Sequence, residues 1–302
     1  MKLPITVLIP TLNAEGHLDE LFDSVESFVA DIIVVDSLSI DQTVDICLRR
    51  GIKIVQRHYV NSSDQFQWML DSLPIKTPWV FFMAQDERFS DSLAKALRIF
   101  FDNGVLETID GCTVKWRLWF MGRPLHATSP NLRLFRTGKC SVTQVACNEH
   151  FRVSGGIGHL DGILEHKDTL NLHEWYEKQN LWTTREAIQQ ARPVSDDERP
   201  VLWGTALQRK AFLRNVLRRV PFRNCIRFLY YWLKFGAWRD GRAGIVWASL
   251  RVWVANVIDL KVEEMRKGEI PSKIPEGRHG DFDSRVIQSK LQKQLLPETC
   301  VG

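Results

Sequence analysis

The chain has 302 residues, 44% of them hydrophobic, and a formal net charge of +4 at pH 7. This length fits one large domain with additions or two small domains, and the hydrophobic share is ample for a core. A net charge this small does not by itself predict binding to nucleic acid. The 6 cysteines form no CxxC pair and stand at no zinc-finger spacing from a histidine, which predicts free thiols in a reducing cytoplasm.

No signal-peptide-like apolar region precedes the first strand-like segment, because residues 1–5 (MKLPI) lead directly into it. The chain also lacks an uncharged apolar run of about 18 residues, so we expect no helix that spans a membrane. The basic charge is concentrated in one region. Residues 209–251 contain eleven Lys or Arg and a single acidic residue, Asp240.

Strand-like and helical segments alternate over the first hundred residues. Apolar runs predict buried strands at 5–10, 32–35, 52–55 and 79–83, and apolar residues at helical spacing predict helices at 17–29, 42–50, 65–73 and 90–101. The alternation predicts a mostly parallel sheet covered by helices on both faces, with right-handed crossovers. Because polar loops follow the strands, they should meet at one edge of this sheet.

The pattern changes after residue 105. Short strands joined by turns predict a mixed β region, with a flexible loop at 154–158 and a short edge strand at 163–166. Helices are then predicted at 170–191, 201–220, 222–235 and 243–265, with a polar break at 193–200 and a loose polar tail from 267. We therefore expect an α/β domain over 1–192 in two halves (1–105 and 106–192), a helical region over 199–267, and a tail over 268–302.

The loops after the predicted strands exclude two familiar phosphate-binding motifs. No GxGxxG follows the first strand and no GxxxxGK[ST] occurs, so neither a dinucleotide site nor a P-loop is supported. The loops carry carboxylates and hydroxyls instead. Such groups suit ribose hydroxyls, a base edge and a metal-bound pyrophosphate.

Three motifs resemble, in order and spacing, the inverting family 2 glycosyltransferases with a GT-A fold. They are residues 7–13 (VLIPTLN), 33–43 (IVVDSLSIDQT) and 79–87 (WVFFMAQDE). Residues 131–138, 148–150, Gly158, His166 and 228–244 are similar to small bacterial members that build lipopolysaccharide core, capsule or exopolysaccharide. The resemblance spans roughly residues 4–265. It is specific to the superfamily and names no sugar.

The resemblance implies a GT-A catalytic domain with the nucleotide sugar held by residues 1–105 and the acceptor by the β region. It implies a UDP-sugar donor, a divalent metal (Mg²⁺ or Mn²⁺), and a lipid-linked or lipid A-core glycan as acceptor. One position departs from the family pattern of Asp-x-Asp-Glu, since the first Asp is Ala84 in this chain.

The family pattern assigns the metal to Asp86, where a carboxylate would help neutralise the leaving diphosphate; a helix-capping Asp is the alternative. His166 is a candidate second ligand, or else a buried, hydrogen-bonded histidine. Asp36 would hold base or ribose, with turn chemistry as its alternative. The remaining residues predicted to line the nucleotide-sugar site are Pro10, Thr11, Asn13, Glu15, Gln85 and Arg133.

Two of these roles carry specific chemistry. Arg133 could clamp phosphate through paired N–H groups, although its place in an alternating strand also fits a solvated face. Inversion needs a base that deprotonates the acceptor hydroxyl, and Glu149 is the candidate. The alternative for Glu149 is a surface glutamate beside a histidine.

Residues 209–253 interleave Arg and Lys with Trp and Tyr in apolar runs of about 14 residues, too short to span a bilayer. This composition favours a helical region at the membrane interface. Packing helices or a homo-oligomer interface are alternatives, and single-stranded nucleic acid has no other support. The sequence thus predicts a cytoplasmic, peripheral-membrane glycosyltransferase. A non-catalytic GT-A scaffold remains open, as does a nucleotidyltransferase, although residues 10–16 lack that class's Gly-rich, Arg-containing loop.

Overall fold

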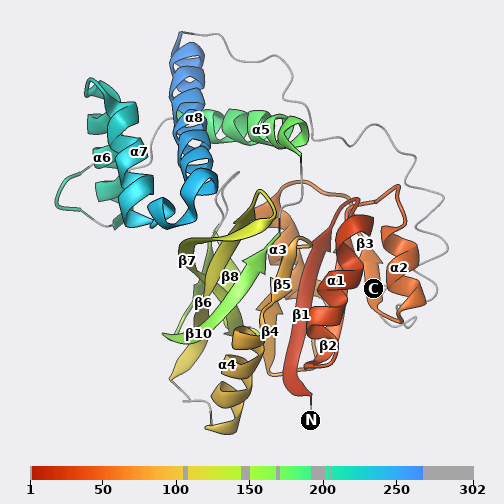
Figure 1. Cartoon of the computed structure of the whole chain (residues 1–302). Helices are drawn as coiled ribbons and strands as arrows, with labels where there is room; N and C mark the ends of the chain where they lie inside the picture. The colour runs from red at the N-terminus through yellow and green to blue at the C-terminus, as the bar shows by residue number, and fades with distance from the viewer. Residues whose placement is uncertain are drawn as a thin grey trace. The chain divides into compact units, whose positions relative to one another are not determined.

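The computed structural model describes residues 2–104, 108–143, 150–167, 171–191, 201–204 and 206–267. These residues form two compact units (Figure 1). The first unit contains the described residues of Met1–Trp119 and Thr128–Asp168, and the second contains those of Phe120–Ala127 and Thr169–His279.

The first unit is built on an 8-stranded sheet of order β3-β2-β1-β4-β7-β6-β10-β5. Its strands are β1 (Leu3–Thr11), β2 (Val29–Asp36), β3 (Lys53–Gln56), β4 (Trp79–Phe82), β5 (Glu87–Phe89), β6 (Ile109–Phe120), β7 (Arg123–Arg136) and β10 (Gly156–His166). β1 pairs in parallel with β2 and β4, β2 with β3, and β10 with β6, whereas β4–β7 and β10–β5 are antiparallel. A short second sheet pairs β8 (Cys140–Val142) with β9 (Phe151–Val153).

Four helices accompany the parallel strands: α1 (Glu15–Val25), α2 (Thr43–Arg49), α3 (Ser62–Ser72) and α4 (Asp91–Asp102). The predicted α/β fold, with a mostly parallel sheet, flanking helices and an added mixed β region, is confirmed. Side-chain alternation along the strands divides the core in two. Val7 and Phe81 lie in the larger cluster with residues of α1 and α4, while Leu8 and Phe82 pack with Met69 of α3. Both faces of the sheet are therefore covered, and polar chemistry is left to its ends.

Two sequence-based expectations differ from the structure. The glycine-rich residues after 154 were expected to form a loop and an edge strand, but they build β10, which lies between β6 and β5 inside the sheet. Glycine permits this close passage, since a Cβ at Gly162 would lie 2.5 Å from Leu93 Cα. The edge is instead β5, in which Glu87 and Arg88, expected in a polar loop after the strand at 79–83, are buried together with Phe89.

The second unit consists of α5 (Leu172–Ala191), α6 (Ala206–Arg219), α7 (Arg223–Lys234) and α8 (Gly241–Arg266), with the tip of the β6–β7 hairpin. α5 packs on α8 through Ala187, Val254 and Ile258 together with Trp175 and Trp182. The sequence placed residues 171–191 with the α/β part, whereas in the structure they belong with the helices. The predicted break at 193–200 and the tail at 268–302 lie outside the described residues.

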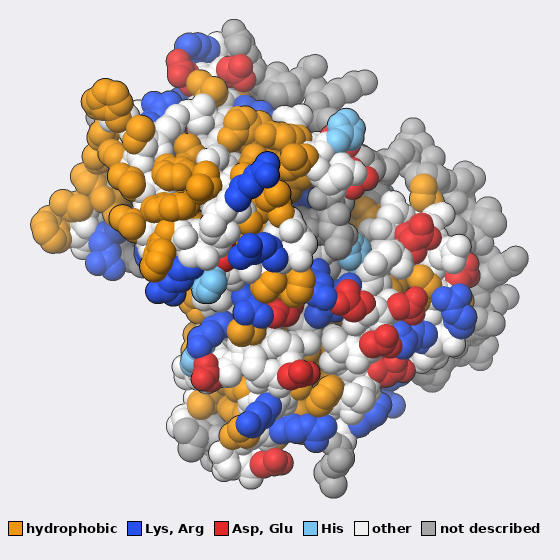
Figure 2. Space-filling model, viewed as in Figure 1, with side chains coloured by type: hydrophobic (Ala, Val, Ile, Leu, Met, Phe, Trp, Pro, Cys, Tyr) orange, Lys and Arg blue, Asp and Glu red, His pale blue; other side chains and the backbone are white. Residues whose placement is uncertain are grey.

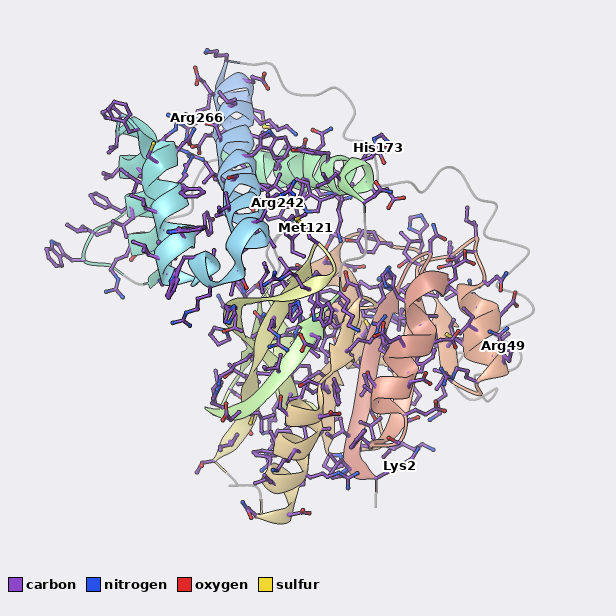
Figure 3. All side chains as sticks on the ribbon, in the orientation of Figure 1. Lys2, Arg49, Met121, His173, Arg242 and Arg266 are labelled. Atoms are coloured by element: carbon purple, nitrogen blue, oxygen red, sulfur yellow. The ribbon has the colours of Figure 1, made fainter. Side chains whose placement is uncertain are left out.

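The hairpin tip is fixed to the beginning of α8. Met121 lies at this tip and Arg242 in the first turn of α8 (Figure 3). The buried carboxylate of Asp240 accepts hydrogen bonds from the backbone N–H of His126 at 3.2 and 3.1 Å, and its Oδ1 lies 2.7 Å from Nδ1 of the same histidine. The tip therefore belongs to the helical unit although β6 and β7 belong to the sheet.

One helix within the described ranges, Ala237–Arg266, is long and apolar enough to cross a membrane by length and composition, with a mean hydropathy of 1.4. This criterion of length and mean hydropathy differs from the one behind the expectation that no helix spans a membrane. The expectation considered uncharged runs, and α8 carries Arg251 inside its apolar stretch. Core helices of soluble proteins pass the same test, and α8 buries Val254, Ile258 and Val262.

Candidate functional site at the carboxyl edge of the sheet

The loops that follow β1 and β4 are joined by the side chain of Gln85. Its Oε1 accepts a hydrogen bond from the backbone N–H of Leu12 at 2.8 Å, and its Nε2 donates to the Leu12 carbonyl at 3.2 Å. With these two hydrogen bonds the Gln85 side-chain amide pairs with the Leu12 backbone as a neighbouring β-strand would. The sequence placed Gln85 among the nucleotide ligands, and the structure shows an amide that holds two loops together.

Asp36 ends β2 and is fully buried. Its Oδ1 accepts the hydroxyls of Thr11, at 3.0 Å, and Ser39, while its Oδ2 accepts the backbone N–H of Ser39 at 2.8 Å and Nε2 of Gln56 at 3.0 Å. Four donors use the full accepting capacity of a carboxylate. The turn chemistry considered for Asp36 is therefore present, and a nucleoside would have to displace one of these donors to bind it directly.

The loops after β1 and β2 are also bonded to each other. Asn13 donates its backbone N–H to Ser39 Oγ at 2.8 Å, and its Oδ1 accepts the N–H of Ile40 at 3.0 Å. Glu15 exchanges an equivalent pair of 3.0 Å hydrogen bonds with the loop at residues 41–42. Asn13 and Leu38 have positive φ, at 46° and 64°. Non-glycine residues held in this region cost free energy and cluster at functional sites.

Asp86 and His166 meet beside this edge. Asp86 lies in the turn between β4 and β5, His166 ends β10, and antiparallel pairing sets His166 opposite Glu87. His166 Nε2 lies 3.0 Å from Asp86 Oδ2, and the backbone N–H of Lys167 donates to the Asp86 carbonyl at 2.7 Å. The imidazole also packs against Trp116, with ring centroids 4.6 Å apart. Asp86 caps no helix, because the α4 N-cap is Ser90.

The Asp86–His166 pair fits part of the coordination of a divalent cation. Two ligands at about 2.1 Å on adjacent corners of an octahedron stand roughly 3.0 Å apart, which matches the observed O···N separation. A carboxylate with an imidazole suits Mn²⁺ better than Mg²⁺. Within the described ranges no group of three or more His, Cys, Asp or Glu gathers for a metal. The other ligands would then be diphosphate oxygens and water.

Glu87, the buried neighbour of Asp86, stabilises the turn that carries the Asp86–His166 pair. It is 1% exposed, and its carboxylate accepts hydrogen bonds from the N–H of Ala84 at 2.8 Å, the indole of Trp116 at 2.8 Å and the guanidinium of Arg133 at 2.6 Å. Arg133 also lies over the Phe82 ring. The predicted phosphate clamp is thus an ion-pair partner of Glu87, and Arg133 lies next to the Asp86 turn rather than on a solvated face.

Arg88 anchors the same turn to α1. It donates to the carbonyls of Gln85, Glu87 and His17 at 3.0, 2.7 and 2.6 Å. Burial lowers the pKa of the Arg88 guanidinium, and nearby Glu20 opposes that shift. The turn that presents Asp86 is therefore fixed on both sides.

The structure brings most of the predicted site residues together. Thr11, Asn13, Glu15, Asp36 and Gln85 form one hydrogen-bonded edge; Pro10, half-buried in β1, directly precedes it. Glu149 lies outside the described residues, so its role stays a prediction. Sequence reasoning missed Gln56 and Trp116, which come from β3 and β6 and carry no local motif.

The fold and this edge define a class of α/β protein whose ligand site lies at the carboxyl ends of parallel strands. No protein-family model matches the chain. It is 28% identical over 260 residues to the lipopolysaccharide core biosynthesis glycosyltransferase LpsC of Rhizobium meliloti (81% of this chain, 86% of that protein). It is 22% identical over 196 residues to an uncharacterized glycosyltransferase of Rickettsia typhi (61% and 66%). The resemblance to glycosyltransferases predicted from the motifs is confirmed by these relatives.

Solved structures with a related arrangement have low similarity. S. aureus TarS 1-349 in complex with UDP-GlcNAc is 16% identical with a TM-score of 0.44, covering 89% of this chain and 93% of that chain. Glucosyl-3-phosphoglycerate synthase from Mycobacterium tuberculosis, in complex with Mn²⁺, UDP and glucosyl-3-phosphoglycerate, is 16% identical with a TM-score of 0.40, covering 65% and 82%.

Proposed function

We propose that the chain is an inverting glycosyltransferase that moves a sugar from a UDP-sugar to a lipid-linked or lipopolysaccharide-core glycan at the cytoplasmic face of the membrane. The observation that carries the proposal is the Asp86–His166 pair beside the hydrogen-bonded loops of β1 and β2. The named activity of the Rhizobium relative supports the acceptor class. The sugar itself is left open.

Donor binding follows from how the edge is built. Asp36 holds Thr11 and Ser39 in place, so the loops offer the nucleoside a rigid surface on which exposed Asn13 is presented. Asp86 and His166 would hold the metal. When bound, the ion neutralises negative charge that develops on the departing diphosphate. Glu87 and Arg88 keep the Asp86 turn in position.

Proton transfer requires one more residue. In an inverting reaction the acceptor hydroxyl attacks the anomeric carbon opposite the leaving group, and a base takes its proton. Glu149 is proposed for this role on the sequence alone. Glu149→Gln should lower kcat about 10²- to 10⁴-fold while donor binding is unchanged. An equal loss of donor binding would contradict the assignment.

A non-catalytic scaffold is the second candidate, favoured by two observations. Ala84 stands where the family pattern has its first Asp, and its backbone N–H donates a hydrogen bond to Glu87. The Gln85 side chain is hydrogen-bonded to the Leu12 backbone. Asp86 is then the carboxylate of the motif that contacts His166. Activity measurements separate the two candidates.

The test is a thermal-shift panel of nucleoside diphosphates and sugar nucleotides, with and without Mn²⁺. A ligand present at 100 times its Kd stabilises the native state by about 2.7 kcal/mol, which raises the Tm of a unit this size by roughly 5–10 °C. Asp86→Ala should abolish the Mn²⁺-dependent part, while Asp161→Ala, which removes an exposed carboxylate elsewhere on β10, should not. If no nucleotide raises the Tm, the proposed function fails; binding without transfer to any glycan lipid favours the scaffold.

A further inference from the structure

Helix α7 is amphipathic with its apolar side facing outward. The exposed fractions are 80% for Phe222 at its N-cap, 45% for Ile226, 52% for Leu229 and 66% for Leu233. These positions are separated by four, three and four residues, which puts them on one face of a helix. Soluble helices direct such a face toward the core, so the outward stripe on α7 needs a partner.

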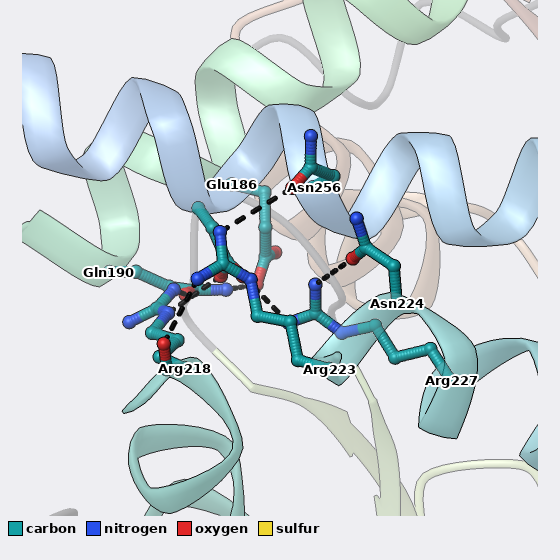
Figure 4. Close-up of polar contacts among 8 residues, drawn as sticks. Glu186, Gln190, Arg218, Arg223, Asn224, Arg227 and Asn256 are labelled. Atoms are coloured by element: carbon teal, nitrogen blue, oxygen red, sulfur yellow. Dashed lines mark hydrogen bonds and ion pairs between the residues drawn. The ribbon is translucent and has the colours of Figure 1, made fainter. Parts of the chain in front are cut away.

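The opposite face of α7 is charged and points inward. Arg227 is 8% exposed and donates to Asp259 Oδ2 of α8 at 2.6 Å, while Arg218 of α6 donates to Oδ1 at 2.6 Å. Arg223 Nε lies 3.8 Å from the same carboxylate and Arg223 reaches Asn256, within the polar cluster of Figure 4. The charged groups that would normally solubilise α7 are therefore used to attach it to α6 and α8.

Exposed apolar side chains also lie on the neighbouring helix α6. We call the set Leu213, Val216, Phe222, Ile226, Leu229 and Leu233 the α6–α7 apolar face; Leu213 is 60% and Val216 44% exposed. Figure 2 shows hydrophobic side chains gathered over α6, α7 and α8 in that view. Single exposed apolar residues are normal, but a contiguous group of this kind marks an interaction surface.

Exposed basic and aromatic side chains follow this face in the chain, at the end of α7 and the start of α8. Lys234, Arg239 and Arg242 are exposed, and so is Trp238 at 51%. Arg218, Arg223 and Arg227 contact Asp259, and Asp240 is buried, so the exposed charge that Lys234, Arg239 and Arg242 add is positive and two copies of this surface would bring like charges together. A negatively charged partner fits it. Trp beside Lys and Arg around an apolar stripe matches the headgroup region of a bilayer.

We propose that the α6–α7 apolar face inserts into the interfacial region of an anionic phospholipid bilayer, with Lys234, Arg239 and Arg242 contacting lipid phosphates. Each basic side chain near such a surface strengthens binding several-fold, and salt weakens it. The binding mode is peripheral, with α7 lying in the plane of the interface. This proposal does not depend on the glycosyltransferase activity.

The first test is co-sedimentation of the full chain with vesicles of phosphatidylcholine alone and of phosphatidylcholine with about 30% phosphatidylglycerol, the share being chosen to give a strongly anionic surface. The wild-type chain should partition onto the anionic vesicles and be released by high salt. The double variant Leu229→Ser/Leu233→Ser should partition roughly ten- to a hundredfold less. Leu48→Ser/Ile99→Ser removes side chains of similar exposure (45% and 49%) from α2 and α4 and should partition normally.

The second test locates the contact. Cys225 is exposed on α7 next to Ile226, and its alkylation by iodoacetamide can be followed by peptide mass spectrometry. Anionic vesicles should slow this alkylation, and phosphatidylcholine vesicles should not.

Equal partition of the leucine double variant and wild type, with matched Tm values, would overturn the proposal. So would equal binding to neutral and anionic vesicles. A wild-type dimer that the double variant converts to a monomer, without any vesicle binding, would assign the face to a second copy of the chain instead.

Discussion

Replacement of Glu87 by alanine should strongly destabilise the first unit, because this one buried carboxylate satisfies donors from separate parts of the sheet. It accepts the Arg133 guanidinium at 2.6 Å, the Trp116 indole at 2.8 Å and the Ala84 backbone N–H at 2.8 Å. The side chains of Glu87 and Arg133 are 1% and 16% exposed. Water cannot readily replace the missing oxygen atoms.

The loss in free energy of unfolding follows from the charge and the N–H donors that Glu87→Ala leaves without a partner. Removing one partner of a buried ion pair costs about 3–5 kcal/mol, since the remaining charge is uncompensated. The orphaned indole and backbone N–H groups each add about 1 kcal/mol or more, and such losses are not additive. We expect about 4–6 kcal/mol in total. Domains of this kind have only about 5–15 kcal/mol to lose.

Urea unfolding followed by circular dichroism would measure the change in free energy of unfolding, with separate transitions assigned if the two units unfold independently. Glu87→Gln keeps an acceptor oxygen and should cost about half as much as Glu87→Ala. Glu20→Ala is the matched control, because this carboxylate is 57% exposed and its ion pairs with Lys167 and Arg88 are worth less than about 1 kcal/mol.

A double-mutant cycle sharpens the test. When Arg133→Met is combined with Glu87→Ala, no unpaired charge remains, and the double variant should be more stable than Glu87→Ala alone. Additive losses in the cycle, or a cost for Glu87→Ala no larger than that for Glu20→Ala, would refute the reasoning that the ion pair holds the turn.

Further substitutions probe packing, thiol chemistry and charge. Gly244→Ala should destabilise the second unit by about 2–4 kcal/mol, because the new Cβ would meet a backbone oxygen at 1.8 Å, whereas Gly16→Ala in open helix surface should stabilise by roughly 0.5–1 kcal/mol; thermal unfolding compares them. Burial raises the pKa of Cys47 to about 12, so iodoacetamide at mildly alkaline pH should modify exposed Cys225 and leave Cys47 intact by mass spectrometry. The pKa of Glu20 is lowered from its ordinary 4.5 by a hydrogen bond from a lysine. The pair therefore stabilises the fold above that pH, and the stabilisation is lost as the pH falls further. Glu20→Gln should accordingly lower the Tm slightly near neutral pH and leave it unchanged in strong acid.

The alternation of strands and helices over the first hundred residues could be predicted because the residue pattern within each segment indicates its secondary structure. An apolar run such as residues 79–83 has to be buried wherever the chain places it, and a loop that follows a parallel strand has to emerge at the same edge as its neighbours. The sequence alone therefore assigns Asp36, Gln85 and Asp86 to one region. Their partners could not be assigned in the same way.

The hydrogen-bond and ion-pair partners of these site residues depended on the tertiary structure, because the partners come from segments distant in the sequence. Residue 86 meets residue 166 because β10 lies between β6 and β5, where the sequence suggested a flexible loop followed by a short edge strand. The donors that saturate Asp36 include Gln56 from β3, and the pair behind Asp86 joins β5 to β7. Local pattern carries no information about which strands become neighbours across a sheet.

Helix α7 likewise combines a feature predicted by local sequence with one determined by tertiary structure. Its sequence determined that it would form a helix with one apolar and one basic face, because that depends only on residue spacing. The structure turns the apolar stripe outward because the other face packs on α8, where Arg227 donates to Asp259 at 2.6 Å and Tyr231 lies against Trp247 with ring centroids 5.7 Å apart. A buried charge must find a countercharge, and only the packed structure determines where that countercharge lies.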